Sequence, residues 1–302
     1  MKIGFLLIEE KEMADFEKVV AEEVENYNSL SFPVKANILE RAIIRRVPIA
    51  KVHPNPDDEF CKPNVGPNYS IISDYIYRIG NGGGFVQTDS AMDSIIVEKI
   101  HPDGYKILNG HHRWAAYYKL GRKYVPVKVV NLTSQEDLER LLKASVHNKR
   151  VLIDFDQVIF RESGEMENEL IFPFNRIYTE RIRKGIPALF HFFASEGYDI
   201  WLFTEQLHSL EYMKNLFKLY HAEITGVITG DKRIPKLNPA VAKSIDDMFY
   251  NKYELTIHIY NDKLYWVDRT AKLSKVFDLE DANWSTTIKN IMGEMGKNAK
   301  KG

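Results

Sequence analysis

The sequence predicts an α/β protein of two domains, a small mixed α+β domain followed by a domain built on a parallel sheet. The chain has 302 residues, which is enough for two domains that each bury a core. In its second half, short apolar runs typical of buried strands alternate with amphipathic segments typical of helices. This alternation favours a parallel sheet with helices on both faces. We place the first domain at residues 1–148, the second at 149–290, and a basic, disordered tail at 291–302.

The composition is that of an ordinary globular protein. Hydrophobic residues make up 44% of the chain, charged residues 27%, and the formal net charge is −1, so no overall charge favours nucleic acid or membrane. The single cysteine, Cys61, excludes an intrachain disulfide framework and a cysteine-only metal site, and it fits a reducing cytosol. The opening apolar run is too short for a signal peptide, and no later run could span a membrane. We therefore expect a cytoplasmic protein.

The first domain reads as short strands and helices joined by turns. An amphipathic helix is expected at residues 15–27, and a glycine-rich loop at 80–84. Strands are expected at 42–53, 94–100, 105–108 and 124–130, and a capped helix at 134–147. A turn-rich segment at 54–67 carries three adjacent acids, Asp57, Asp58 and Glu59.

A cluster of polar and basic residues lies where the strand at 105–108 gives way to a helix. Main-chain N–H groups at a helix N-terminus bind anions, and a guanidinium group and two imidazoles add hydrogen-bond donors and positive charge. The sequence therefore predicts a phosphate-binding site formed by Asn109, Gly110, His111, His112 and Arg113.

Residues 42–131 resemble the ParB/sulfiredoxin-like family. The resemblance rests on Gly110-His-His-Arg113 at the helix start and on Leu120-Gly-Arg-Lys-Tyr-Val125-Pro-Val127 in the returning strand. It implies that the loop holds nucleotide phosphates, those of CTP in ParB-type clamps and of ATP or ADP in sulfiredoxin and free serine kinases. The catalytic cysteine of sulfiredoxin is replaced by histidine here, and no helix-turn-helix segment follows. A kinase of this family would need an acidic base, for which Glu59 is the candidate.

In the second domain, polar side chains follow the predicted strands at one rim. Asp154 and Asp156 follow the apolar run Val151–Ile153, and two carboxylates this close suit a divalent cation, or a nucleophile beside a general acid and base. Two further strands end in Thr204 and Asp262. The carboxyl ends of parallel strands meet at one edge of a sheet, where open α/β sheets bind ligands.

This pattern resembles the haloacid-dehalogenase superfamily of phosphohydrolases over residues 149–285. The resemblance implies that Asp154 attacks phosphorus, that Asp156 acts as general acid and base, and that Mg²⁺ is held by Asp154, the Asp156 carbonyl and Asp262. Thr204 and a lysine would neutralise the phosphoryl oxygens. The lysine is Lys236 or Lys232, and a second acid, Asp268, lies further along the chain. The loop at 161–175 is too short for a large cap, so the domain should have little or none.

We therefore expect a Mg²⁺-dependent phosphotransfer enzyme, a phosphatase acting through an aspartyl-phosphate on a phosphorylated small molecule or nucleotide. Two alternatives remain open. One is an ATP- or ADP-dependent, serine-type kinase in the first domain. The other is a nucleic-acid-binding or nucleotide-gated protein whose second domain is a degenerate scaffold and whose groove is lined by Arg45, Arg46, Arg113, Arg122, Lys123 and Lys128.

Overall fold

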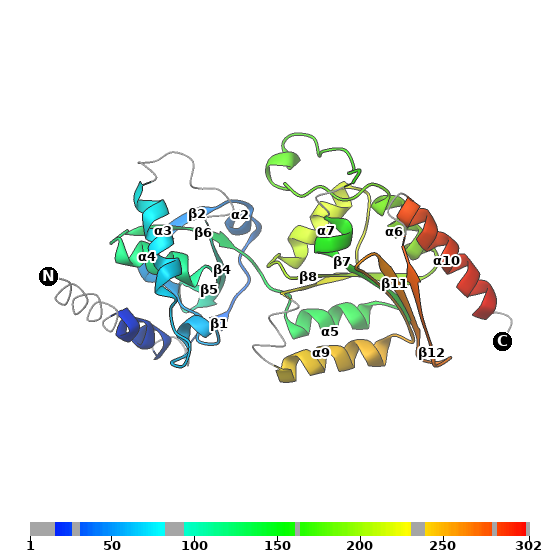
Figure 1. Cartoon of the computed structure of the whole chain (residues 1–302), viewed down its shortest axis with the longest axis horizontal. Helices are drawn as coiled ribbons and strands as arrows, with labels where there is room; N and C mark the ends of the chain where they lie inside the picture. The colour runs from blue at the N-terminus through cyan, green and yellow to red at the C-terminus, as the bar shows by residue number, and fades with distance from the viewer. Residues whose placement is uncertain are drawn as a thin grey trace. The chain divides into compact units, whose positions relative to one another are not determined.

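The chain folds as two compact units, each with its own sheet (Figure 1). The computed structural model describes residues 16–25, 31–81, 94–160, 164–230, 239–279 and 283–299. Unit 1 is Met1–Asn131 and unit 2 is Leu132–Gly302. Both units combine helices with a sheet that contains parallel strand pairs, which confirms the predicted α/β class. Among the described residues, no helix has both the length and the apolar character needed to cross a membrane.

The sheet of unit 1 is mixed. Its central strand β4 pairs in parallel with β6 and antiparallel with β5. Buried valine and isoleucine side chains such as Val97, Ile107 and Val127 form its apolar core. In spatial order the strands are β2 (Arg45–Pro48), β6 (Tyr124–Val129), β4 (Ile95–His101), β5 (Tyr105–Asn109) and β3 (Val52–His53), and β1 (Phe32–Pro33) pairs with β4.

Helices cover this sheet. The predicted leading helix is present at residues 16–25, and its buried Phe16 packs against Trp114 with ring centroids 6.1 Å apart. Helix α3 was not predicted from the sequence, although Asn68 gives a start signal by accepting the N–H groups of Ser70 and Ile71. The other helices of unit 1 are α2 (Ile38–Ala42), α3 (Tyr69–Asn81) and α4 (His111–Lys119), with single turns η1 (Ile49–Lys51) and η2 (Glu59–Cys61).

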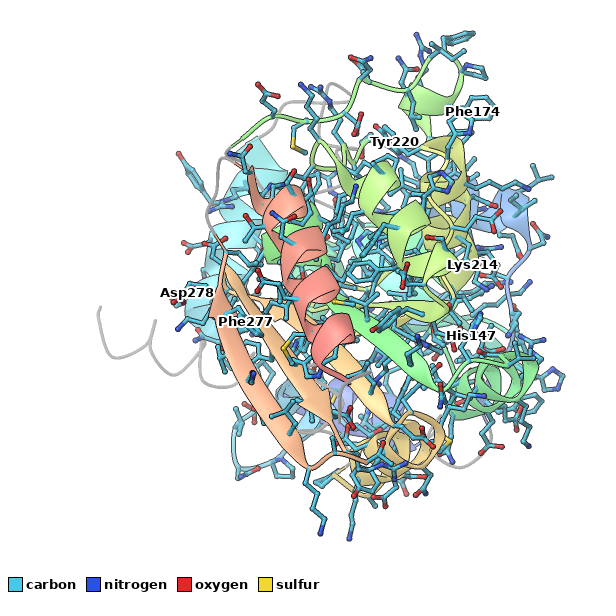
Figure 2. All side chains as sticks on the ribbon, turned by 90° about the vertical axis from the view of Figure 1, so that its right-hand side faces the viewer. His147, Phe174, Lys214, Tyr220, Phe277 and Asp278 are labelled. Carbon is cyan, nitrogen blue, oxygen red and sulfur yellow. The ribbon has the colours of Figure 1, made fainter. Side chains whose placement is uncertain are left out.

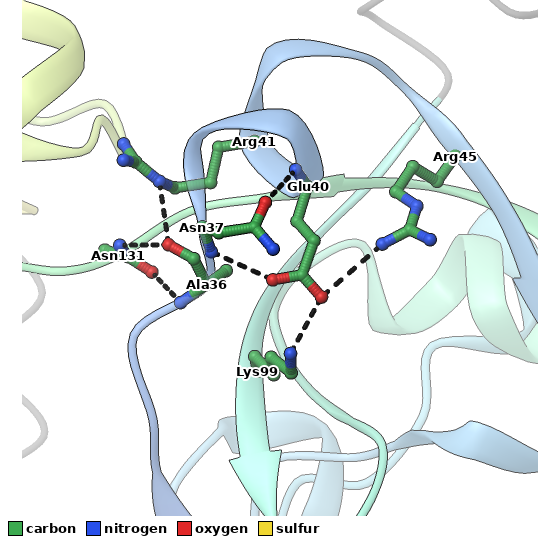
Figure 3. Close-up of polar contacts among 7 residues, drawn as sticks. All are labelled: Ala36, Asn37, Glu40, Arg41, Arg45, Lys99 and Asn131. Carbon is green, nitrogen blue, oxygen red and sulfur yellow. Dashed lines mark hydrogen bonds and ion pairs between the residues drawn. The ribbon is translucent and has the colours of Figure 1, made fainter.

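Polar contacts around α2 connect the early part of unit 1 to β4 and to the last residue of the unit (Figure 3). Asn37 and Glu40 form a reciprocal capping box, and the Glu40 carboxylate also binds the Lys99 ammonium group at 2.7 Å. The amide of buried Asn131 exchanges two hydrogen bonds with the main chain of Ala36, at 2.8 and 3.0 Å. These bonds tie Asn131, the last residue of unit 1, to the segment that leads into α2.

Unit 2 contains a six-stranded sheet whose centre is parallel. Strand β7 lies between β10 and β8, and all three run in the same direction. At one edge, β11 pairs antiparallel with β10 and β12 pairs antiparallel with β11. These antiparallel pairs were not predicted from the sequence. In spatial order the strands are β12 (Leu273–Asp278), β11 (Lys263–Asp268), β10 (Leu255–Tyr260), β7 (Lys149–Asp154), β8 (Tyr198–Thr204) and β9 (Gly226–Thr229).

The helices of unit 2 cover both faces of its sheet. Helices α6 (Ile186–Ser195), α7 (Leu210–Leu219) and α10 (Trp284–Ala299) pack on one face through a large apolar cluster. Figure 2 shows α10 lying across this face, next to the strand that ends at Phe277 and Asp278. Helices α5 (Gln135–Ala144) and α9 (Pro239–Lys252) pack together on the other face around Trp201. Short helical turns η3 (Phe155–Ile159) and η4 (Phe174–Arg176) follow β7.

These contacts bear on two predicted boundaries. The compact units divide after Asn131, whereas the sequence prediction places the domain boundary after residue 148. Leu138 and Leu142 of α5 pack with Phe249 of α9 in unit 2. The segment from residue 291 is not a disordered tail through residue 299, since it forms the last turns of α10 with Met295 buried. Residues 300–302 lie outside the described residues.

Candidate functional sites

The predicted carboxylates of unit 2 lie at the carboxyl end of β7. Asp154 is its last residue and is only 5% exposed. One of its oxygens, Oδ1, accepts the main-chain N–H of Gln157 at 2.7 Å. Asp154 thereby caps η3, a wide helical turn that contains Asp156. The two acids are thus fixed by local geometry, with the nucleophile candidate in a nearly dry position where charge interactions are strong.

Thr204, at the end of the neighbouring strand β8, contacts Asp156 through its side chain. Thr204 ends β8, is 1% exposed, and its Oγ1 lies 3.0 Å from Oδ1 and 2.9 Å from Oδ2 of Asp156. The main-chain N–H of Glu205 donates to the same carboxylate at 2.9 Å, and that of Gln206 donates to Thr204 Oγ1 at 3.0 Å. The hydroxyl therefore orients Asp156, and its predicted contact with a phosphoryl group remains a prediction.

The candidate metal ligand Asp262 lies in the hairpin turn between β10 and β11. Asn261 and Asp262 have φ angles of 50° and 54°, as a two-residue type I′ turn requires. Ile259 is in register with Ile153, so the turn follows β10 at the rim where Asp154 ends β7. The predicted site uses two carboxylates and the Asp156 carbonyl. Among the described residues, no group of three or more His, Cys, Asp or Glu side chains could hold a metal ion.

The alternative acid, Asp268, is at the wrong end of the sheet. It pairs with Leu255 at the start of β10, and Leu255 pairs with Lys149 at the start of β7. At ~3.3 Å per residue, Asp268 is about 16 Å along the strand direction from the level of Asp154. Its Oδ1 accepts the N–H of Ala271. Asp268 therefore does not substitute for Asp262. Both candidate lysines, Lys232 and Lys236, lie outside the described residues.

The predicted phosphate loop of unit 1 begins α4. Gly110 has a φ of 107°, and a Cβ there would lie 3.0 Å from the Arg113 guanidinium. Glycine is needed at this position for both reasons. Arg113 is buried and donates to the Ser94 carbonyl at 2.6 Å and to Asn109 Oδ1 at 3.5 Å. The guanidinium group therefore braces the loop against β4 and β5.

The two histidines of this loop hold neighbouring segments. Nε2 of His111 accepts the N–H of Asn55 at 3.1 Å, and Nε2 of His112 accepts the N–H of Asn68 at the same distance. A ring nitrogen that accepts a hydrogen bond carries no proton, so neither ring is positively charged in this arrangement. Burial also lowers the pKa of His112. Both imidazoles are thus engaged with the main chain in this arrangement, and the main-chain N–H groups at the start of α4 are the donors left for the predicted anion.

Asp58, one of the three adjacent acids of the turn-rich segment, approaches this loop. Asp58 caps η2 through the N–H of Phe60 and lies 3.6 Å from Nδ1 of His111. The predicted base, Glu59, is exposed at the surface one residue further on. Only the fold of the segment at 54–67 decides which of the adjacent acids faces the loop.

Part of this chain is similar to a known domain family. Residues 85–146, about a fifth of the chain, match the family model of the ParB N-terminal domain. No curated protein matches in sequence. A structure of a free serine kinase variant in complex with AMP is 13% identical, with 83% of this chain and 96% of that chain covered, at a TM-score of 0.24. A conserved hypothetical protein from Pyrococcus furiosus is 12% identical, with coverages of 86% and 88% and a TM-score of 0.22.

Fold and sites together define a two-unit α/β protein. Its first unit contains most of a segment similar to the ParB N-terminal domain, as the residues from Gly110 to Arg113 had suggested. The family match extends through α5, which packs in unit 2. The TM-scores of the solved structures are too low to extend the likeness further. The function of unit 2 must therefore be argued from its own geometry.

Proposed function

We propose that unit 2 is a phosphomonoesterase that works through an aspartyl-phosphate on Asp154. The observation that carries this proposal is the fixed pair of acids at one rim, where Asp154 caps η3 and Asp156 is held by the Thr204 hydroxyl and the Glu205 N–H. The haloacid-dehalogenase resemblance of these residues supports the same assignment. A buried carboxylate beside an oriented second carboxylate suits a nucleophile and a general acid.

The reaction would proceed in two balanced steps. The Asp154 carboxylate forms a bond to phosphorus while the ester P–O bond breaks, and protonated Asp156 gives its proton to the departing alkoxide. Asp156 then takes a proton from water, whose oxygen attacks phosphorus and releases Asp154 and inorganic phosphate. Thr204 keeps Asp156 in place throughout, so it is a positioning residue.

The donor set at this rim fits Mg²⁺, which prefers oxygen ligands. Asp154, the Asp156 carbonyl and Asp262 would hold it, because the register of β10 and β7 brings Asp262 to the same rim. The ion would supply charge neutralisation for the phosphoryl oxygens. The substrate class is a phosphorylated small molecule or nucleotide.

Release of phosphate from para-nitrophenyl phosphate with MgCl₂ tests this proposal. Asp154→Asn should lower kcat by more than about 1000-fold, since it removes the nucleophile. Asp268→Asn is the matched control, because Asp268 lies at the opposite end of the strands from Asp154 and should leave the rate unchanged. Mass spectrometry of the quenched wild type should detect a phosphate adduct on the peptide with Asp154. Wild-type rates in Asp154→Asn would exclude the mechanism.

A second candidate function is nucleotide binding by unit 1. The match to the ParB N-terminal domain and the glycine-led start of α4 favour it. Titration of the full chain with ATP, ADP and CTP measures it. Gly110→Ala should abolish binding, because the new Cβ meets the Arg113 side chain, whereas Gly121→Ala places a Cβ in open space at a similarly positive φ and should bind normally. Equal nucleotide affinity in the two variants would show that the loop at Gly110 does not bind the nucleotide.

Two further readouts distinguish the remaining alternatives. ATP consumption that depends on added serine would support the serine-type kinase, and Asp58→Asn beside Glu59→Gln would tell which acid serves as base. Retention on DNA or RNA that falls steeply with salt would support nucleic-acid binding. Because Arg45 already faces Glu40 at 3.6 Å, part of the proposed basic groove is neutralised within the fold.

A further inference from the structure

A cavity in unit 2 lies apart from the rim that carries Asp154. It measures about 520 Å³ and lies between α9 and the face of the sheet formed by β7, β10 and β11. Its volume falls in the range of small-molecule sites, roughly 300–1,000 Å³. None of Asp154, Asp156, Thr204 and Asp262 lines it. Any ligand here is therefore distinct from the phosphate group proposed for the rim.

The floor of the cavity contains a cation without a carboxylate partner. Arg150 of β7 donates through Nε to Thr256 Oγ1 at 3.0 Å and stacks over the rings of Phe249 and Tyr253. Within the described residues no acid lies at ion-pair distance from it, and the nearby Asp246 carboxylate favours its charge without forming a salt bridge. Burial lowers the pKa of Arg150 to about 10, so the folded chain keeps the charge at neutral pH at a cost in desolvation. An arginine held in this way matches a carboxylate or phosphate oxygen pair.

An unused polar atom lies beside this cation. His258 of β10 also lines the cavity, and its Nε2 is buried without a hydrogen-bond partner among the described residues. Because the protein covers this atom almost completely, a ligand in the cavity can contact the imidazole ring but does not reach Nε2. Aromatic side chains surround His258, and the centroid of the Tyr265 ring is 5.9 Å from that of its imidazole. Tyr250 of α9 adds a ring that is 61% exposed at the cavity wall.

The mouth of the cavity has the opposite charge. Asp246, Asp247 and Glu254 are exposed lining residues, while Arg269 lies over the ring of Tyr250 with its CZ atom 4.4 Å from the centroid. Three acids at the entrance repel a polyanion such as a nucleoside triphosphate. They favour a ligand whose positive end stays at the mouth while its negative end reaches the floor.

We propose that this cavity binds a small aromatic zwitterion of the amino-acid type. The carboxylate is held by Arg150, the ring lies among Tyr250 and Tyr265, and the ammonium group faces the acidic mouth. The proposal does not depend on the phosphatase assignment, because it uses a different cavity and a binding readout.

Isothermal titration of the full chain with three matched probes tests it. L-phenylalanine carries both charges and the ring, phenylpropionate lacks the ammonium group, and phenethylamine lacks the carboxylate. L-phenylalanine should bind saturably, and each of the others at least about tenfold more weakly, as expected for loss of a charge-assisted contact. Tighter binding of phenylpropionate than of L-phenylalanine, or no saturable binding of any probe, overturns the proposal.

Two variants locate the binding in this cavity. Arg150→Met should weaken L-phenylalanine binding by at least about tenfold, while Lys143→Met, which removes an exposed cation from α5, should leave it unchanged. Tyr250→Ala keeps the proposal testable if Arg150→Met does not fold, because an exposed ring can be removed without loss of the core. Wild-type affinity in folded Tyr250→Ala or in folded Arg150→Met refutes the assignment.

Discussion

Replacement of Thr204 by valine isolates the hydrogen bonds that hold Asp156. Valine has nearly the same shape as threonine, so the packing at this 1%-exposed position is kept while the hydroxyl is lost. The hydroxyl has two partners, the Asp156 carboxylate at 2.9 Å and the N–H of Gln206 at 3.0 Å. Thr204→Val therefore removes one hydrogen bond to a charged group and leaves one main-chain donor without its acceptor.

These two bonds set the expected magnitude. A hydrogen bond to a charged group contributes about 1.5–3 kcal/mol and a neutral one about 0.5–1.5 kcal/mol. Their sum predicts that Thr204→Val lowers the free energy of unfolding of unit 2 by about 2–4 kcal/mol. Thr204→Ser keeps the hydroxyl and loses only a methyl group, so most of the stability should remain.

Tryptophan fluorescence during urea denaturation measures this difference. Three of the four tryptophans, Trp201, Trp266 and Trp284, lie in unit 2, and only Trp114 lies in unit 1, so the signal follows mainly the unit that carries the substitution. In the phosphate-release assay, Thr204→Val should also lower kcat more than Thr204→Ser does. Equal stability and equal kcat for the valine and serine variants would refute the positioning role.

Three further predictions concern unit 2. Gly226→Ala should lower the free energy of unfolding by about 1–3 kcal/mol, because a Cβ there would lie 2.3 Å from the Trp201 ring. Gly293→Ala, in open space on α10, should instead raise it by about 0.4–1 kcal/mol, and urea denaturation measures both. Tyr253→Phe should lower it by about 2–4 kcal/mol, because the hydroxyl joins an indole N–H to a buried carboxylate; the melting temperature reports this. Burial lowers the pKa of His258 from 6.5 to about 4. The free energy of unfolding should therefore decrease as the pH is lowered from 6.5 to about 4, because the unfolded chain gains a proton that the folded chain does not. His258→Gln should flatten this pH dependence in urea titrations.

Each of these predictions has a result that contradicts it. The two glycine variants make the same chemical change, so a shift of the same sign in both would mean that packing against the indole does not decide the outcome. An unchanged melting temperature in Tyr253→Phe would show that Asp199 keeps its hydrogen bonding without the phenol. For His258→Gln, a pH slope equal to that of the wild type would assign the acid sensitivity to other groups.

The sequence was enough to locate the elements whose signals are local. The apolar run that ends at Asp154 becomes β7, and the glycine followed by His111, His112 and Arg113 begins α4 as predicted. Both depend on residues that are close together in the chain, where periodicity and the conformational needs of glycine act directly. The start signal of α3 at Asn68 was equally local and was overlooked.

Only the tertiary structure decided which side chains meet. Strand pairing brings the Thr204 hydroxyl to Asp156 and carries Asp268 to the opposite rim from Asp154. The same long-range contacts assign α5 to unit 2 and show that both imidazoles beside Gly110 accept main-chain N–H groups. A sequence records the order of donors and acceptors along the chain, but partner choice depends on register and on packing between segments that are far apart in it.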